Sequence, residues 1–535
     1  MKALQSVSFR LPPERLSGVL NHLRRHVNLD GGDEHLDEVT YFDTFDWRLH
    51  RAARRFELRR GAAFGRRPQT LCRLTGDDAP LDLPGSELGK HGPGFAADMP
   101  EGPFRDAVEA LIKMRRLLPA LTLRTTTTEW RVLGPENKTV VRLFLESPTA
   151  HPHPWPGPNT QTEATAGAVL DPRLRVEPVR GYDDADRKLR QLLHKTLDLP
   201  VADRSLFEDG ATRCGLPLGL YSSKPEIHIG ADETAADATR AVLLFLLEAM
   251  EANEDGTRRD VDSEFLHDFR VAVRRTRAAL SQIKRVFPDD RTLYFKQEFR
   301  WLGGLTGPTR DLDVYLLKMP DYRRDLPAAA QHDLRPLEAY LATKQRREQR
   351  RLAKGLTSPR YRKLIADWRA FLESDEAPPL PDNAAVPIRD LASERIRKIY
   401  RRVLKQGLAI DDASPAERLH DVRLECKKLR YLMEFFRSLY ARSEVDGAIK
   451  ALKRLQDNLG DFNDYEVQQA SLGELAEELA ARPGCSAGTL LAMGRLQSRL
   501  AEGRRRERDA FKARFDEFAS GANQALYECL FRLGS

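Results

Sequence analysis

Apolar and polar residues alternate over several short segments of the N-terminal part of the chain, which is the pattern of half-buried strands. These segments are 7–11, 41–44, 56–60, 70–74, 126–131, 139–145 and 173–179. Between them, apolar residues recur at helical spacing and predict helices over 13–26, 104–118 and 183–196. The proline-rich stretch 148–167 predicts a loop or an insertion.

From about residue 234 onward, long runs have a helical period instead. Helices are expected near 235–252, 262–287, 291–303, 310–317 and 328–354, and a second helical set begins near 388, after a break at 374–382. The expected fold class is multidomain, with an N-terminal α+β antiparallel domain followed by an all-α domain of two bundles. The expected boundaries are 1–215 for the first domain, 216–230 for a linker, and 231–535 for the helical domain, with bundles over about 231–373 and about 388–535.

The helical part contains an internal repeat. The segment from His267 to Arg277 reappears 153 residues later, from His420 to Arg430, with matching residue types. The same offset relates further pairs, namely Leu302 and Leu455, Gly307 and Gly460, Asp311 and Asp464, and Val314 and Val467. A shared offset over such a length indicates a duplicated helical unit.

Each copy of the repeat places cations on one side of a helix. At about 100° per residue, four residues of each copy fall on one stripe: His267, Arg270, Arg274 and Arg277 in the first, and His420, Arg423, Lys427 and Arg430 in the second. An apolar stripe lies beside each one: Phe269, Val273, Thr276, Leu280 and Ile283, then Val422, Cys426, Leu429, Met433 and Phe436. A solvated helix face normally mixes charge signs, and these stripes do not, so the pattern favours a polyanion site.

Composition limits the other possibilities. The 535 residues carry a net charge of +7, spread over both halves, so an anion site must come from local clustering rather than from bulk charge. No apolar run is long enough to span a membrane, and the N-terminus lacks the apolar core of a signal peptide, so we expect a cytoplasmic protein without a membrane partner. The five scattered cysteines fit reduced thiols.

The helical part resembles the CHAD domain (conserved histidine α-helical domain) over about 226–535. The resemblance rests on the doubled stripe, on the segments from Leu302 to Gly307 and from Arg310 to Val314, and on the segment from Leu455 to Asp464. It implies two pseudo-symmetric four-helix bundles that bind inorganic polyphosphate in a basic central groove, in some cases on polyphosphate granules. The implied ligands are His267, Arg270, Arg274, Arg275, Arg277, His420, Arg423, Lys427, Lys428 and Arg430.

The N-terminal part resembles a CYTH domain, the triphosphate tunnel fold. The resemblance rests on the segments 41–49, 56–59 and 176–182. That family carries an E-x-E-x-K signature on its first strand, and this chain has Ser6 and Ser8 where the metal-binding glutamates belong. Without those carboxylates a divalent cation has no oxygen cage. We therefore expect no catalytic residue, metal or cofactor, and at most weak phosphate binding by Arg59, Arg73, Arg124 and Arg142, which are otherwise ordinary surface residues.

Three other functions remain open. The His-Asp dipeptides at 267–268 and 420–421 occur in metal phosphohydrolases, but here they lie among cations that repel a metal ion. A nucleic-acid binder needs similar cations, yet few aromatic residues alternate with this stripe. A metal-dependent CYTH triphosphatase with CHAD as its substrate-binding module is the third, and Ser6 and Ser8 count against it. Asp311 and Asp464 are expected to be structural.

Overall fold

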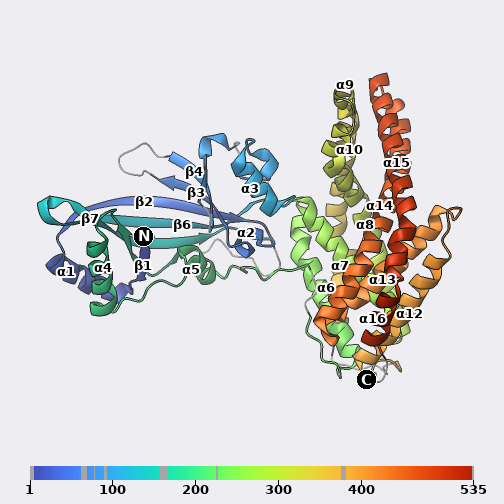
Figure 1. The fold of residues 1–535 in the computed structure, drawn as a ribbon, viewed down its shortest axis with the longest axis horizontal. Coiled ribbons are helices and arrows are strands. Elements are labelled where there is room, and N and C mark those ends of the chain that lie inside the picture. Colours follow the sequence, from blue (N-terminus) through green and yellow to red (C-terminus); the bar gives the residue numbers. More distant parts are fainter. Residues whose placement is uncertain are drawn as a thin grey trace. The chain divides into compact units, whose positions relative to one another are not determined.

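The structure is a computed structural model that describes residues 5–61, 69–76, 79–88, 93–156, 167–223, 227–374 and 381–532. The chain divides into two compact units, Met1–Ser222 and Ser223–Ser535 (Figure 1). The first unit contains the described strands, and the second is helical. The expected order of an antiparallel domain followed by an all-α domain is confirmed.

A nine-stranded antiparallel sheet forms the first unit. Its order is β1-β9-β7-β6-β2-β3-β4-β5, and β8 pairs with β7. The strands are β1 (Val7–Arg10), β2 (Leu29–Asp43), β3 (Arg55–Gly61), β4 (Gln69–Thr75), β5 (Leu81–Pro84), β6 (Leu118–Leu133), β7 (Thr139–Pro152), β8 (Ala168–Val169) and β9 (Arg173–Pro178). The helices are α1 (Leu16–His26), α2 (Arg48–Arg51), α3 (Pro103–Ile112), α4 (Asp183–Gln191) and α5 (Leu206–Arg213).

Three elements of this unit differ from the sequence expectation. The prediction of a loop over 148–167 is wrong at its first residues, because β7 continues to Pro152 and pairs with β6 and β8. Strand β2 begins at Leu29, well before the expected 41–44, and passes through Gly31, whose φ of 100° suits glycine, at a register shift against β6. Helix α3 ends at Ile112 because Lys113 takes a positive φ.

The two faces of the sheet have different coverings. Apolar residues of one face form two clusters, one with α1 and α4 and one with α3. The strand register places Tyr41, Glu57 and Arg59 on the opposite face. Helix α5 packs on that second face, because Phe207 lies 4.8 Å from the Tyr41 ring and Gly210 lies against Leu121.

The helical unit repeats its own layout. Its helices are α6 (Ala235–Arg258), α7 (Ser263–Gln282), α8 (Asp289–Arg324), α9 (Ala328–Gln331), α10 (Arg335–Leu356), α11 (Pro359–Glu373), α12 (Ile388–Leu408), α13 (Ala416–Phe435), α14 (Arg442–Ala480), α15 (Ala487–Phe518) and α16 (Gly521–Leu530). The first residues of α6, α7 and α8 recur at the 153-residue offset in α12, α13 and α14. The duplication read from the sequence is therefore also present in the helix boundaries.

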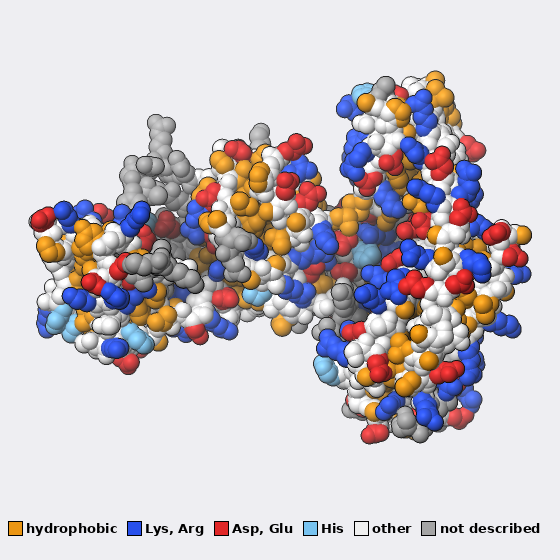
Figure 2. Space-filling view, viewed as in Figure 1, with side chains coloured by type: hydrophobic (Ala, Val, Ile, Leu, Met, Phe, Trp, Pro, Cys, Tyr) orange, Lys and Arg blue, Asp and Glu red, His pale blue; other side chains and the backbone are white. Residues whose placement is uncertain are grey.

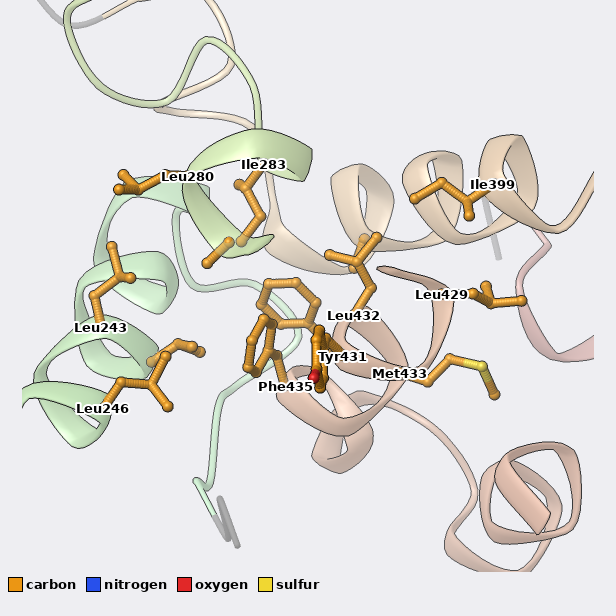
Figure 3. Close-up of a cluster of buried hydrophobic side chains, with 14 of the residues drawn as sticks. Leu243, Leu246, Leu280, Ile283, Ile399, Leu429, Tyr431, Leu432, Met433 and Phe435 are labelled. Atoms are coloured by element: carbon orange, nitrogen blue, oxygen red, sulfur yellow. The ribbon is translucent and has the colours of Figure 1, made fainter. Parts of the chain in front are cut away.

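One hydrophobic core joins the two repeats. Figure 3 shows Leu243, Leu246, Leu280 and Ile283 of the first repeat in one cluster with side chains of α12 and α13 from the second. The predicted apolar stripes of α7 and α13 are buried in this cluster, with Phe269, Val422 and Leu429 each 0% exposed. The two repeats consequently pack as one body with a shared core.

Helix α8 replaces two helices that the sequence predicts separately, at 291–303 and 310–317. It continues through Pro308, which removes one backbone donor. No helix among the described residues is long and apolar enough to cross a membrane. Of the five cysteines, Cys72 and Cys426 are buried, whereas Cys529 is exposed.

Candidate functional site

Helix α7 carries the first cationic stripe. The Asp262 side chain caps its start, accepting hydrogen bonds from the backbone of Glu264 at 3.0 Å and Phe265 at 3.2 Å. With the apolar stripe in the core, Arg274 is left exposed and Arg270 half-buried. The helix therefore presents its arginines on a face that the core does not use.

Helix α13 presents the second stripe in the same way. Val422 and Cys426 are buried, while Arg423, Lys427 and His420 are half-buried. Arg423 lies 3.8 Å from the Asp464 carboxylate of α14. Its partial burial lowers the pKa of its guanidinium despite this neighbour. Burial therefore affects the Arg423 guanidinium more strongly than its neighbouring carboxylate does.

The two stripes converge, because α7 and α13 are in contact. Burial, followed by the positive charges of Arg423 and Arg274, lowers the pKa of Lys427 to about 8. Arg274 of α7 also lowers the pKa of Arg423. Cations from both repeats thus influence one another across the helix pair. We define the central cationic cluster as Arg270 and Arg274 of α7, Arg310 of α8, and Arg423 and Lys427 of α13.

Glycines of α8 let the arginines of α7 approach its backbone. Arg270 donates to the Gly303 carbonyl at 3.3 Å and to Thr306 Oγ1 at 3.1 Å. A Cβ at Gly307 would lie 3.4 Å from Arg270 Nη1, and one at Gly303 would lie 3.0 Å from Arg277 Nη1. Burial lowers the pKa of Arg270 to about 10. The cation is therefore fixed in place by polar contacts to a neighbouring helix.

Two carboxylates at equivalent repeat positions accompany the cations. Asp311 of α8 and Asp464 of α14 are close enough for Asp464 to raise the pKa of Asp311. Burial contributes more to that rise, and it outweighs the opposing effect of Arg270, Arg310 and Arg274. Asp311 and Asp464 thus lie among the cations, and Glu264, Asp313 and Asp268 also act on Arg310.

The two repeated histidines have different partners. His267 Nδ1 lies 3.0 Å from Arg310 Nη2, a donor, so Nδ1 acts as the acceptor in this contact. His420 Nδ1 lies 2.8 Å from Asn463 Oδ1. Asn463 stands at the repeat position of Arg310. These contacts orient both rings, which supports a positioning role for the histidines.

Some predicted ligands lie elsewhere. Arg275 is 8% exposed and donates to Glu434 at 2.7 Å and to the Ser223 carbonyl at 2.7 Å, so structural contacts occupy it. Lys428 donates to Glu425 at 2.6 Å on another side of α13. The Arg277 side chain reaches the surface, and partial burial of its guanidinium, followed by the charge of Arg300 of α8, lowers its pKa. Arg430 lies 3.5 Å from Glu434.

Arg310 belongs to the cluster but was not among the predicted ligands. It donates to the Ser263 carbonyl at 3.0 Å and lies 4.0 Å from Glu264, and burial lowers its pKa. The sequence signal that could have found it is its place next to the repeated Asp311. Its counterpart in the second repeat is an asparagine, so comparing the repeats does not mark it as a conserved cation.

The arginines expected to bind phosphate in the first unit all have acidic neighbours. Arg59 pairs with Glu57 at 2.6 Å, Arg73 binds Asp82 at 2.7 Å through two hydrogen bonds, and Arg142 lies 3.8 Å from Glu177. Arg124 pairs with Glu38 at 3.0 Å. By the strand register it lies on the opposite face of the sheet from Arg59 and Arg73. The structure therefore does not bring the four together.

The resemblance to the CYTH domain would place a metal ion on the face of the sheet that α5 covers. On this face, acidic and basic side chains balance one another. Ser8 pairs with Arg175, which binds Glu146 at 2.6 Å. Arg10, two residues on, lies 3.8 Å from Asp209 of α5. The described residues hold no group of three or more His, Cys, Asp or Glu side chains that could bind a metal ion. Pairs of an arginine and a carboxylate, together with α5, therefore line this face.

Comparison with known proteins gives relatives of this chain. Two uncharacterised proteins of Mycobacterium tuberculosis, from strains CDC 1551 and H37Rv, are each 29% identical to this chain over 213 residues. The match covers 39% of this chain and 39% of each relative, so the chain matches about two fifths of their length.

Solved structures resemble the chain as well. The CHAD domain from the plant Ricinus communis is 28% identical, covers 54% of this chain and 94% of its own, and has a TM-score of 0.46. A candidate adenylyl cyclase from Hippeastrum with a dominant triphosphatase activity is 13% identical, covering 40% of this chain and 97% of its own with a TM-score of 0.25. The CHAD domain family matches residues 241–473. The helical C-terminal half of this chain therefore contains a CHAD domain.

Proposed function

We propose that the helical unit binds inorganic polyphosphate at the central cationic cluster. One observation carries the proposal: cations from both repeats converge where α7 meets α13, so that Arg274 of the first repeat acts on Arg423 and Lys427 of the second. Polyphosphate binding is also what resemblance to the CHAD domain implies. A linear polymer with about one negative charge per phosphate would supply the missing counter-charge along both helices.

The chemistry of the side chains suits phosphate. Arginine forks onto phosphate oxygens with charge-assisted, often bidentate hydrogen bonds, and lysine adds a compact point charge. Repulsion between Arg274, Arg423 and Lys427 opposes folding of the empty site. A bound anion relieves it. Affinity should thus come mainly from electrostatics and from release of bound counterions.

The cations of the two stripes have different roles in this proposal. Arg270, Arg274, Arg423 and Lys427 are the principal anion ligands, and Arg277, Arg310 and Arg430 extend the positive field. His267 and His420 orient neighbouring groups. Arg275 and Lys428 are omitted because Glu434 and Glu425 engage them.

The test is a fourfold variant in which Arg270, Arg274, Arg423 and Lys427 become glutamine. Binding of long-chain polyphosphate at physiological salt should weaken by at least about a hundredfold, because each lost charge-assisted contact is worth about 1.5–3 kcal/mol. Fluorescence anisotropy with end-labelled polyphosphate measures it.

A matched control removes four exposed cations from α10, by changing Arg346, Arg347, Arg350 and Lys354 to glutamine. This α10 control should bind nearly as tightly as the wild type. Equal weakening in both variants would show that overall charge, not the cluster, attracts the polymer, and the proposal would fail. Circular dichroism spectra check that each variant is folded.

The polymer class is tested with DNA of equal total charge. Tyr431, an aromatic residue that acts on Arg423 of the cluster, is buried and offers no exposed ring on which a base could stack. Polyphosphate should therefore outcompete DNA. Preference for DNA would instead support a nucleic-acid-binding protein. A cytoplasmic location on polyphosphate granules follows from the same proposal, and fluorescence microscopy of the tagged protein in cells that store polyphosphate tests it.

A further inference from the structure

A second concentration of cations lines a pocket between α12 and α13. The pocket has a volume of about 630 Å³. Its lining residues are Lys398, Arg401, Arg402, Lys405, Gln406, Ala409, Arg418 and Asp421. Five of these carry positive charge and one carries negative charge. We call this the α12–α13 pocket.

The cations on α12 form a single stripe. Lys398, Arg401 and Lys405 are spaced so that they project within about 60° of one another around the helix. The stripe covers two helical turns, which is about 10 Å along the axis. Like charges at such spacings repel by a few tenths of a kcal/mol per pair, so the empty stripe is unfavourable.

Few carboxylates neutralise the pocket. Arg402 binds Glu425 at 3.1 Å, which compensates that one cation. Within the part of the chain that the structure describes, Lys398, Arg401, Lys405 and Arg418 have no ion-pair partner. All four are exposed and can meet a ligand from solvent.

The pocket's charge is not inherited from the duplication. The residues 153 positions earlier, which occupy the corresponding face of the first repeat, are Phe245, Glu248, Ala249, Ala252 and Phe265. None of these is a cation. The central cluster appears in both repeats, whereas this positive surface belongs to the second repeat alone, so a requirement of the duplicated core does not explain it.

Helix α13 separates the pocket from the central cationic cluster. Asp421 and Arg418 project about 100–160° around the helix from His420, on the side that faces α12. Lys427 and Arg423 project from the other side, toward α7. A ligand in the pocket therefore meets a different set of side chains from a polymer on the central cluster.

We propose that the α12–α13 pocket is a separate anion site for a short inorganic phosphate chain of about three phosphates. Its concave shape and two-turn stripe limit the length of polyanion that it can hold. The described lining has no aromatic side chain on which a nucleobase could stack, which favours an inorganic chain over a nucleotide. The site is independent of the proposed function, because it uses none of the same residues.

The experiment is calorimetric titration of the full chain with tripolyphosphate at low salt. A pocket variant carries Lys398→Gln, Arg401→Gln and Lys405→Gln, and its matched control carries Arg346→Gln, Arg350→Gln and Lys354→Gln on α10. We expect the pocket variant to lose one binding event or to weaken it at least about tenfold, and the α10 triple variant to keep it. The fourfold cluster variant should also retain this event.

Two outcomes would overturn the proposal. One is an unchanged titration of the pocket variant, with the stoichiometry and affinity of the α10 triple variant. The other is ATP binding to the pocket more tightly than tripolyphosphate, which would make it a nucleotide site. Failure of the fourfold cluster variant to change long-chain binding would refute the central cluster and leave this result standing. The exposed single change Arg401→Glu provides a second pocket variant if the triple change reduces folding.

Discussion

Lys427 is the residue at which the electrostatics of the cluster can be measured by titration. Burial and the neighbouring Arg423 and Arg274 lower its pKa from 10.5 to about 8. At pH values between these two pKa values, Lys427 binds more protons in the unfolded chain than in the folded one. The contribution of Lys427 to the free energy of unfolding of the empty protein therefore increases as pH rises through that window.

A phosphate polymer beside Lys427 should reverse this shift, since an anion favours the charged ammonium. We predict net proton uptake on binding at pH values just above about 8, and an affinity that falls as pH rises further. Calorimetry in buffers with different ionisation enthalpies measures the uptake. Lys427→Arg should abolish it because arginine keeps its charge. Equal uptake by wild type and Lys427→Arg would assign the proton to another group.

At the scale of elements, helix α12 depends on a close approach to α15. A Cβ added at Gly407 would overlap the Phe515 ring, whereas a Cβ at Gly447 of α14 would meet nothing within 4 Å. Both glycines lie inside helices, where alanine is otherwise favoured by about 0.5–1 kcal/mol. The two positions thus form a pair of helical glycines that differ in packing.

We predict that Gly407→Ala lowers the free energy of unfolding of the helical unit by about 1–3 kcal/mol, through overpacking. Gly447→Ala should raise it by about 0.5–1 kcal/mol. Urea unfolding followed by far-ultraviolet circular dichroism compares the two. Stabilisation by Gly407→Ala would mean that α12 and α15 do not pack as described.

The sequence predicted elements best where a long apolar period repeats. The apolar stripes of α7 and α13 follow from such a period, and the burial of Phe269 and Val422 confirms them, although α7 ends at Gln282 and not at the expected residue 287. Helix α8 was missed as one element because Pro308 resembles a helix break. Because Pro308 has no backbone N–H, the carbonyl of Gly304 lacks its helical hydrogen bond, and Gly304 is exposed to solvent. Buried residues on both sides of this position hold the helix together.

The site was predictable as a stripe but not in its pairings. Helical spacing alone puts Arg270, Arg274 and Arg277 on one face of α7. It cannot show that Arg275 meets Glu434, which is 159 residues away in the sequence. Such long-range partners are set by the packing of α7 on α13. Pairing therefore decides which cations remain available for an anion.

At the scale of the whole molecule, the position of the positive charges, rather than their total number, determines where an anion can bind. Figure 2 shows Lys and Arg side chains interspersed with Asp and Glu over the face in view, in agreement with a net charge of only +7. The sheet of the first unit pairs its predicted phosphate-binding arginines with acids, while the central cluster of the helical unit brings cations of α7 and α13 close to one another. The same residue type thus has different roles in the two units.

For the first unit we predict no triphosphatase activity. Ser6 and Ser8 cannot supply the carboxylates that a catalytic Mg²⁺ or Mn²⁺ needs, and Glu57 and Asp82 neutralise Arg59 and Arg73. Phosphate release from tripolyphosphate with either metal, measured colorimetrically, should stay at background. Robust turnover that survives the fourfold cluster variant would show that this unit is an enzyme.

The most direct test of the central claim is the affinity for long-chain polyphosphate measured across a range of salt concentrations. By analogy with single-stranded nucleic acids, the logarithm of affinity should fall linearly with the logarithm of salt concentration, by about 0.7 for each phosphate contacted. Changing Arg270, Arg274, Arg423 and Lys427 to glutamine should make that slope shallower by about 3 and weaken binding at every salt concentration. An unchanged slope and affinity in this variant would contradict the account.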